Sequence, residues 1–162
     1  MYDSIAPSYN ELHEEEQLRK LKAISKYIKV KKSDKLLDIG CGTGISTNFF
    51  NCKTIGIDPS KEMIKQGKGN LIHGYAEKLP FKDKIFDIII AITSIHNFKD
   101  PEKALNEILR VKKPKAKIII TLLKKSNKYN EIRKLIIQKI NPKIINEDKD
   151  TIFINKNEKQ RL

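Results

Sequence analysis

Residues 36–44 read LLDIGCGTG, and this stretch predicts more of the fold than any other. An apolar run stops at an acid, Asp38, and glycines follow at every second position from Gly40 to Gly44. Such a run ending in a glycine loop is typical of a buried strand that turns beside a bound nucleotide or nucleoside. The first question is therefore what kind of ligand this loop binds.

Two well-known phosphate-binding loops do not match. The loop G-x-x-x-x-G-K-[ST] needs a lysine after its last glycine, and Ile45 follows Gly44 instead. The dinucleotide loop G-x-G-x-x-G, counted from Gly40, needs a glycine where Ile45 stands. The carboxylate of Asp38 would repel a pyrophosphate but attract the ammonium and sulfonium groups of S-adenosylmethionine. The glycines would let the backbone approach the methionyl part of that cofactor.

A second acid supports the same ligand. In IGIDPS, residues 55–60, Asp58 ends an apolar run and lies 18 residues after Gly40. In nucleoside-binding sheets an acid roughly 20 residues beyond the glycine loop accepts hydrogen bonds from the ribose. Asp38, the glycine loop and Asp58 together predict a site for a positively charged nucleoside without phosphate.

Strand-like and helix-like stretches alternate along the chain, which predicts an α/β fold with a mostly parallel sheet covered on both faces. The helices are expected over residues 11–29, 46–50, 59–68, 101–111 and 126–140. The strands are expected over residues 35–40, 53–58, 70–76, 86–93 and 116–123. Residues 143–148 and 151–155 predict a closing antiparallel hairpin. The whole chain, 1–162, is expected to form one domain.

Six stretches resemble the class I, seven-stranded S-adenosylmethionine-dependent methyltransferases, and among them the small enzymes related to the ubiquinone/menaquinone methyltransferases. They are YDSIAPSYNEL (2–12), LLDIGCGTG (36–44), IGIDPSKEMI (55–64), GYAEKLPF (74–81), FDIIIAITSIHNF (86–98) and ALNEILRVKKPKAKIIIT (104–121). The resemblance implies a three-layer sandwich around a doubly wound sheet with strand order 3-2-1-4-5-7-6. It also implies that the last two strands form the antiparallel hairpin.

The resemblance further implies which residues bind S-adenosylmethionine. They are Tyr9, Asp38, Gly40, Gly42, Asp58, Pro59, Met63, Ala76, Glu77 and Thr93. Met63 would lie against the adenine and the backbone N–H of Ala76 would bond to the ring. Tyr75 stands where the family usually has an aspartate that accepts from the adenine amino group, so this bond would pass to Glu77 or be lost. A second departure, KPKA at 113–116, replaces the usual Pro-Gly-Gly turn and changes surface charge more than chemistry.

His96, in TSIHNF, is the candidate catalytic residue. It follows the fourth expected strand, where the family's reactive methyl group points. It would act as a base or as a positioning donor if the acceptor must lose a proton. The alternative is a histidine that packs over the cofactor or shapes the pocket.

The formal net charge is +13 at pH 7, and the basic residues are unevenly distributed. Residues 110–143 carry twelve Lys or Arg against one acid. Such a stretch can bind a polyanion, although lysine-rich surfaces also occur in hyperthermophile proteins as solvation. RNA, either tRNA or rRNA, is the first acceptor expected, bound through Lys124, Lys125 and Lys128. A small molecule, quinone-like or another metabolite, is the alternative. A non-catalytic cofactor-binding subunit is a third possibility, and a protein partner could complete the site.

The rest of the composition bears on the location of the protein and on the state of its cysteines. No apolar run approaches the ~18 residues that a membrane helix needs, and the acidic N-terminus lacks the apolar stretch of a signal peptide. A cytoplasmic protein without membrane contact is expected. Cys41 and Cys52 are expected to be free thiols, and they give no support for a zinc site.

Overall fold

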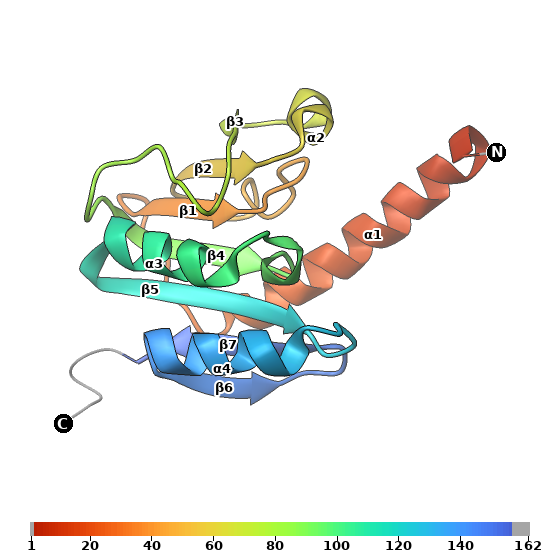
Figure 1. The fold of residues 1–162 in the computed structure, drawn as a ribbon. Helices are drawn as coiled ribbons and strands as arrows, with labels where there is room; N and C mark the ends of the chain where they lie inside the picture. Colours follow the sequence, from red (N-terminus) through yellow and green to blue (C-terminus); the bar gives the residue numbers. More distant parts are fainter. Residues whose placement is uncertain (1, 157–162) are drawn as a thin grey trace.

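The computed structural model describes the backbone of residues 2–156 and the side chains of residues 11–156. Helices and strands alternate, as the sequence predicts (Figure 1). The helices are α1 (Tyr2–Ser25), α2 (Lys61–Gln66), the 3₁₀ helix η1 (Ile95–Asn97), α3 (Pro101–Val111) and α4 (Tyr129–Ile140). The strands are β1 (Lys35–Ile39), β2 (Lys53–Asp58), β3 (Leu71–His73), β4 (Phe86–Ile92), β5 (Lys112–Leu123), β6 (Pro142–Asn146) and β7 (Asp150–Asn155).

The strands form one seven-stranded sheet in the order β3-β2-β1-β4-β5-β7-β6. The strands from β3 to β5 pair in parallel, whereas β7 runs antiparallel to both β5 and β6. The predicted strand order and the closing hairpin are thus confirmed. Because β7 is reversed, its first residue, Asp150, pairs with Leu123 at the end of β5. Asp150 therefore lies at the edge of the sheet where the parallel strands end.

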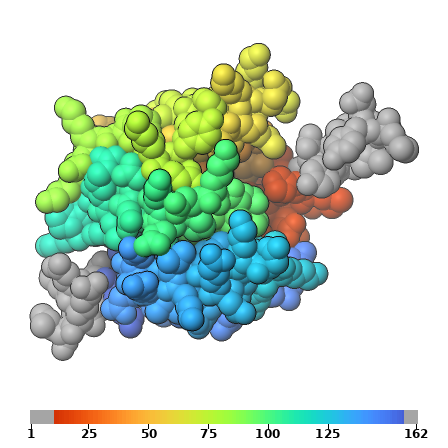
Figure 2. All heavy atoms as spheres, in the orientation of Figure 1, coloured from red at the N-terminus to blue at the C-terminus, as the bar shows by residue number. Residues whose placement is uncertain are grey.

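Helices cover both faces of the sheet, which confirms the three-layer sandwich. Helices α3 and α4 lie on one face and form the near surface in Figures 1 and 2. Helix α1 lies on the other face, where its buried side chains join those of β4, β5 and β7. Its N-terminal half projects past the carboxyl ends of the parallel strands (Figure 1). None of the helices within residues 2–156 is long and apolar enough to cross a membrane.

Several local predictions were wrong. The first helix begins at Tyr2 and ends at Ser25 rather than at 29, β3 ends at His73 rather than at 76, and β5 begins at Lys112 rather than at 116. Residues 46–50 form turns rather than a helix, because Ser46 and Thr47 donate to the buried carboxylate of Asp38 and β2 begins at residue 53. Helix α2 begins after Ser60, whose hydroxyl accepts from the backbone N–H of Met63 as an N-cap, so Pro59 precedes the helix. Helix α4 begins after Lys128, and no side chain caps it.

Candidate cofactor and acceptor site

The glycine loop follows β1 and packs against the segment that follows β4. Gly40 has φ +76°, and a Cβ built on it would lie 2.4 Å from the Cβ of Ser94. The hydroxyl of Ser94 in turn donates to the carbonyl of Ile39 at 2.9 Å. Only glycine allows both this backbone conformation and this approach. The loop after β1 and the segment after β4 are therefore in direct contact.

Gly42 is a partly buried residue of the loop with open space beside it. It has φ +55°, and a Cβ built on it would have no described atom within 4 Å. Its backbone N–H donates to Oδ2 of Asp58 at 2.9 Å. By contrast, a Cβ on Gly44 would lie 2.6 Å from the carbonyl oxygen of Lys68, so this third glycine serves packing. The open side of Gly42 leaves room for a ligand against the backbone.

Asp58 lies at the tip of β2 and is held from two sides. Besides the bond from Gly42, its Oδ1 accepts from the backbone N–H of Ser60 at 2.8 Å. The side chain is only partly buried. A carboxylate offers about four acceptor positions, so roughly two remain for donors such as ribose hydroxyls. The carboxylate is thus fixed in place and still able to accept.

Asp38 lies beneath the loop and is fully buried. Its Oδ2 accepts from the hydroxyls of Ser46 and Thr47, while Oδ1 has no hydrogen-bond partner among the described residues. Burial raises the pKa of Asp38 to about 6, the two hydroxyl bonds oppose this rise, and the charge of Asp58 adds to it. A cation bound nearby would favour the ionised form.

The residues expected around the adenine lie after β2 and β3. Ala76 is buried, whereas Met63 is 46% exposed. The carbonyl of Pro59 lies 3.1 Å from Nε2 of His73, and Oε2 of Glu77 accepts from the backbone N–H of Asp100 at 3.0 Å. Tyr9 is among the residues whose side chains lie outside the described part of the structure.

A charged network that sequence reasoning missed holds the segment after Ala76. Arg110 donates to the carbonyls of Leu79 and Phe81 and to the carboxylates of Asp83 and Glu107. Glu107 also accepts from the backbone N–H of Leu79 at 2.9 Å. The hydrogen bond from Arg110 holds the pKa of Glu107 below its usual range. The spacing E-x-x-R within 104–121 was the available signal, since it places both side chains on one helix face.

Thr93, at the tip of β4, belongs to a group of polar residues that hydrogen-bond to one another. Thr93 has φ +50°, unusual for a β-branched residue, and its backbone N–H donates to both the carbonyl and the hydroxyl of Thr121. Its own hydroxyl accepts from Nζ of Lys20 at 3.2 Å. Lys20 also forms an ion pair with Asp150 at 2.9 Å. The structure thus places Thr93 beside α1 and β7, next to the residue that contacts the glycine loop.

His96 lies in η1, directly after this tip. Its ring is partly buried, and Nδ1 has no hydrogen-bond partner within the described part of the chain. Burial lowers the pKa of His96 below 6.5; the charge of Asp150 opposes this, while those of Lys20 and Lys128 add to it. The imidazole is therefore neutral at pH 7 and has a lone pair that can accept a proton.

The basic residues of 110–143 do not form one surface. Lys113 and Lys115 lie at the start of β5, whereas Lys124 and Lys125 follow its end, at the opposite edge of the sheet. Lys124, Lys125 and Lys128 are exposed at the carboxyl edge of the sheet, and Nζ of Lys124 donates to the carbonyl of Glu147.

Taken together, these groups suit S-adenosylmethionine. A fixed acid at the tip of β2 suits its ribose, the open face of Gly42 suits its methionyl part, and the buried acid below suits its cationic groups. Comparison with known proteins agrees. The sequence profile of the methyltransferase domain family matches residues 37–120, and the chain belongs to this family. The family and fold imply S-adenosylmethionine as the cofactor.

Individual relatives support the same family. The chain is 35% identical over 125 residues to an uncharacterised protein of Methanocaldococcus jannaschii, covering 75% of this chain and 49% of that one. It is 34% identical over 132 residues to demethylmenaquinone methyltransferase of Paenarthrobacter aurescens, covering 74% and 52%. A solved S-adenosylmethionine-dependent methyltransferase of Thermotoga maritima superposes with a TM-score of 0.64 at 26% identity, covering 85% and 70%. The chain spans about half the length of the first two relatives.

Proposed function

We propose that this chain transfers a methyl group from S-adenosylmethionine to a small-molecule acceptor. The contact between Gly40 and Ser94 is the observation that carries this proposal. It brings the cofactor-type loop of β1 against the polar tip of β4, so donor and acceptor could meet there. Methyl transfer requires mainly that the two reactants be aligned and shielded from water.

Each residue of the cofactor half has a proposed task. S-adenosylmethionine, when bound, supplies a methyl group on a positively charged sulfur. Asp58 would accept from the ribose hydroxyls, and Gly42 would leave its backbone open to the methionyl part. Asp38 would balance the positive charge from beneath the loop. Met63 and Ala76 would border the adenine.

Other residues are proposed for the edge of the cofactor site. Pro59 would shape the turn after Asp58. Because Glu77 already binds the backbone of Asp100, its proposed role is to hold the adenine segment in place. Thr93 would border both the cofactor and the acceptor.

His96 is the proposed base. A nucleophile that carries a proton must release it as the new bond to carbon forms, and a neutral imidazole can accept it. Nδ1 of His96 is buried and has no hydrogen-bond partner within the described residues. The lowered pKa keeps this nitrogen available at neutral pH.

The names of relatives favour a small acceptor. Besides the demethylmenaquinone methyltransferases, a norajmaline N-methyltransferase of Rauvolfia serpentina is 34% identical over 105 residues. RNA remains the second candidate because Lys124, Lys125 and Lys128 are exposed at the edge where the site lies. The separation of the other lysines weakens that candidate.

One experiment tests the proposal. The purified protein is incubated with S-adenosylmethionine carrying a labelled methyl group and with native cell extract separated into RNA, protein and small molecules. We expect label in the small-molecule fraction. Label in RNA alone would instead indicate that RNA, the second candidate, is the acceptor. Binding of the cofactor without label in any fraction, even after a partner-containing extract is added, would indicate a non-catalytic subunit.

A further inference from the structure

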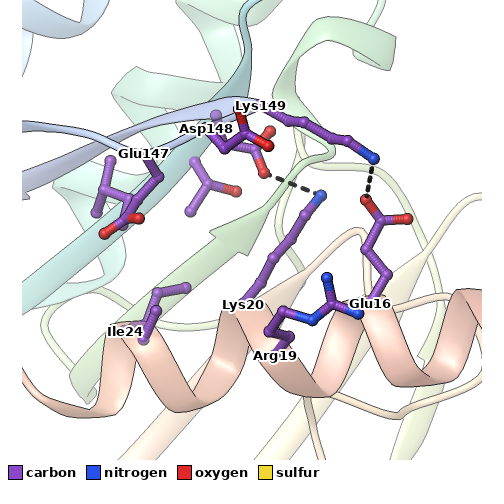
Figure 3. A pocket seen from close by; sticks show the side chains of 11 residues that line it. Glu16, Arg19, Lys20, Ile24, Glu147, Asp148 and Lys149 are labelled. Atoms are coloured by element: carbon purple, nitrogen blue, oxygen red, sulfur yellow. Dashed lines mark hydrogen bonds and ion pairs between the residues drawn. The ribbon is translucent and has the colours of Figure 1, made fainter.

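A cavity of about 150 Å³ lies between α1 and the turn that joins β6 to β7 (Figure 3). Ala23 and Ile24 of α1 and Ile152 of β7 form its apolar part. Thr121, whose hydroxyl lies 3.0 Å from that of Thr93, connects it to the tip of β4. An apolar cavity of roughly 150 Å³ can bind a benzene-sized ring. The size and lining suit one ring, beside the point where methyl transfer is proposed.

Asp150 lines this cavity and is 4% exposed. Its Oδ2 is paired with Lys20 at 2.9 Å, but its Oδ1 has no hydrogen-bond partner in the described part of the structure. A buried carboxylate oxygen without a donor costs free energy, so such atoms are rare in native proteins. The carboxylate of Asp150 therefore has an unused capacity to accept a hydrogen bond, although Oδ1 itself is buried.

The charges around the cavity disfavour a phosphate. Its lining carries four carboxylates and three cations, so the surplus is negative. The carboxylates are Glu16, Glu147, Asp148 and Asp150, and the cations are Arg19, Lys20 and Lys149. Two ion pairs, Lys20 with Asp150 and Lys149 with Glu16, connect α1 to the turn (Figure 3). A nucleotide in RNA would bring its phosphates against this surplus, whereas a neutral molecule would not.

We propose that this cavity binds the methyl acceptor, a small neutral ring compound whose O–H or N–H donates to the carboxylate of Asp150. This inference rests on the proposed function, which supplies the reason for a second ligand beside the cofactor. Asp150 is here a positioning and specificity residue for the acceptor. Lys20 holds the carboxylate in place through Oδ2 and through its bond to Thr93.

The test uses two probes of the same shape, phenol and toluene, of which only phenol has a donor. Each is titrated into the full chain while the methyl NMR signals of Ile24 and Ile152 are followed. The titrations are run with and without S-adenosylhomocysteine. We expect phenol to shift both signals and to bind about tenfold more tightly than toluene, because a hydrogen bond to a charged group contributes roughly 1.5 kcal/mol or more.

Two variants and one control variant locate the effect. Asp150→Asn replaces the charged acceptor by a neutral one, and the preference for phenol should fall to about threefold or less. Asp87→Asn is the matched control, since Asp87 is also paired with a lysine, Lys113 at 3.0 Å, but at the opposite edge of the sheet. It should leave the preference unchanged. Ala23→Leu fills the cavity, so it should abolish the binding of both probes and slow methylation at least tenfold at unchanged affinity for S-adenosylhomocysteine.

Equal binding of phenol and toluene, or no shift at Ile24 and Ile152 up to the solubility of phenol, would overturn the inference. Undiminished methylation by Ala23→Leu would overturn the assignment of the cavity to the acceptor. Failure of S-adenosylhomocysteine to bind would instead refute the proposed function, and the titrations without it would still report on the cavity.

Discussion

The carboxylate of Asp58 accepts a hydrogen bond from the backbone N–H of Gly42 at 2.9 Å. The acid at the tip of β2 therefore holds the glycine loop of β1 in addition to any bond it makes to a ribose. Removing it should affect the cofactor in two ways, by losing an acceptor and by releasing the loop. About two hydrogen bonds to the charged carboxylate of Asp58 would be lost.

We expect Asp58→Ala to weaken the binding of S-adenosylhomocysteine by about 100-fold or more, since two bonds to a charged group together contribute about 3 kcal/mol. Isothermal titration calorimetry measures the affinity. Asp87→Asn, at the other edge of the sheet, should leave it unchanged. An affinity for Asp58→Ala within threefold of the unaltered protein would remove Asp58 from the cofactor site.

The buried acid Asp38 predicts a dependence of stability on pH. Its pKa in the folded protein is about 6, above the usual value of 3.8, because burial disfavours the charged form. The folded state therefore holds this proton more tightly than the unfolded state. Stability from this group is complete below about pH 4 and is lost as the pH rises through about 6. The loss is on the order of 2–3 kcal/mol.

Asp38→Asn should remove that dependence. We expect urea unfolding of the unaltered protein to show a falling free energy of unfolding between pH 4 and pH 7, and the variant to show a flatter profile. Saturating S-adenosylmethionine should reduce the slope, because a bound cation favours the ionised form. A slope identical in the variant and the unaltered protein would place the titrating group elsewhere.

His96→Gln should slow turnover by about 100-fold or more if the acceptor must lose a proton, while the affinity for S-adenosylhomocysteine stays within twofold. In the unaltered enzyme the rate should rise with pH through the pKa of His96, below 6.5, and level off near neutrality. The variant should lack this rise. Single-turnover rates across pH 5–8 measure both effects, and unchanged rates would leave His96 a packing residue.

Arg110→Lys should loosen the segment after Ala76, because a lysine cannot reach two carboxylates and two carbonyls together. We expect a loss of about 1–3 kcal/mol in the free energy of unfolding and faster amide hydrogen exchange at Leu79. Lys134→Arg, on α4, is a control for the conservative exchange itself. Protection of Leu79 equal to that in the unaltered protein would show that Glu107 alone holds this segment.

Neutralising Lys124, Lys125 and Lys128 together tests the RNA candidate. If RNA binds there, the affinity for a tRNA mixture should fall with salt, and the triple glutamine variant should reduce the slope of log K against log salt by about two to three. The triple variant Lys112→Gln, Lys113→Gln, Lys115→Gln at the start of β5 is the matched control. Equal slopes for both variants would mean that RNA does not bind preferentially through Lys124, Lys125 and Lys128.

Local signals in the sequence, namely apolar runs, glycines and acids at strand ends, predicted the alternation of strands and helices and placed the glycine loop and Asp58 at strand ends. The strand order followed only from the resemblance to the methyltransferase family. The sequence could not predict that Asp38 lies beneath the loop, since its bonds to Ser46 and Thr47 depend on how the next turn folds. It also missed the group formed by Lys20, Thr93 and Asp150. These residues are far apart along the chain and meet only because β7 runs antiparallel beside β5.

The close packing of Gly40 on Ser94 has a practical consequence for protein engineering. No side chain fits at residue 40, and a larger one at residue 94 would push the glycine loop away from the tip of β4. Directed evolution towards new acceptors should leave this pair untouched. Diversity belongs farther out, in the wall formed by α1 and β7, where a change in shape would not reach the donor.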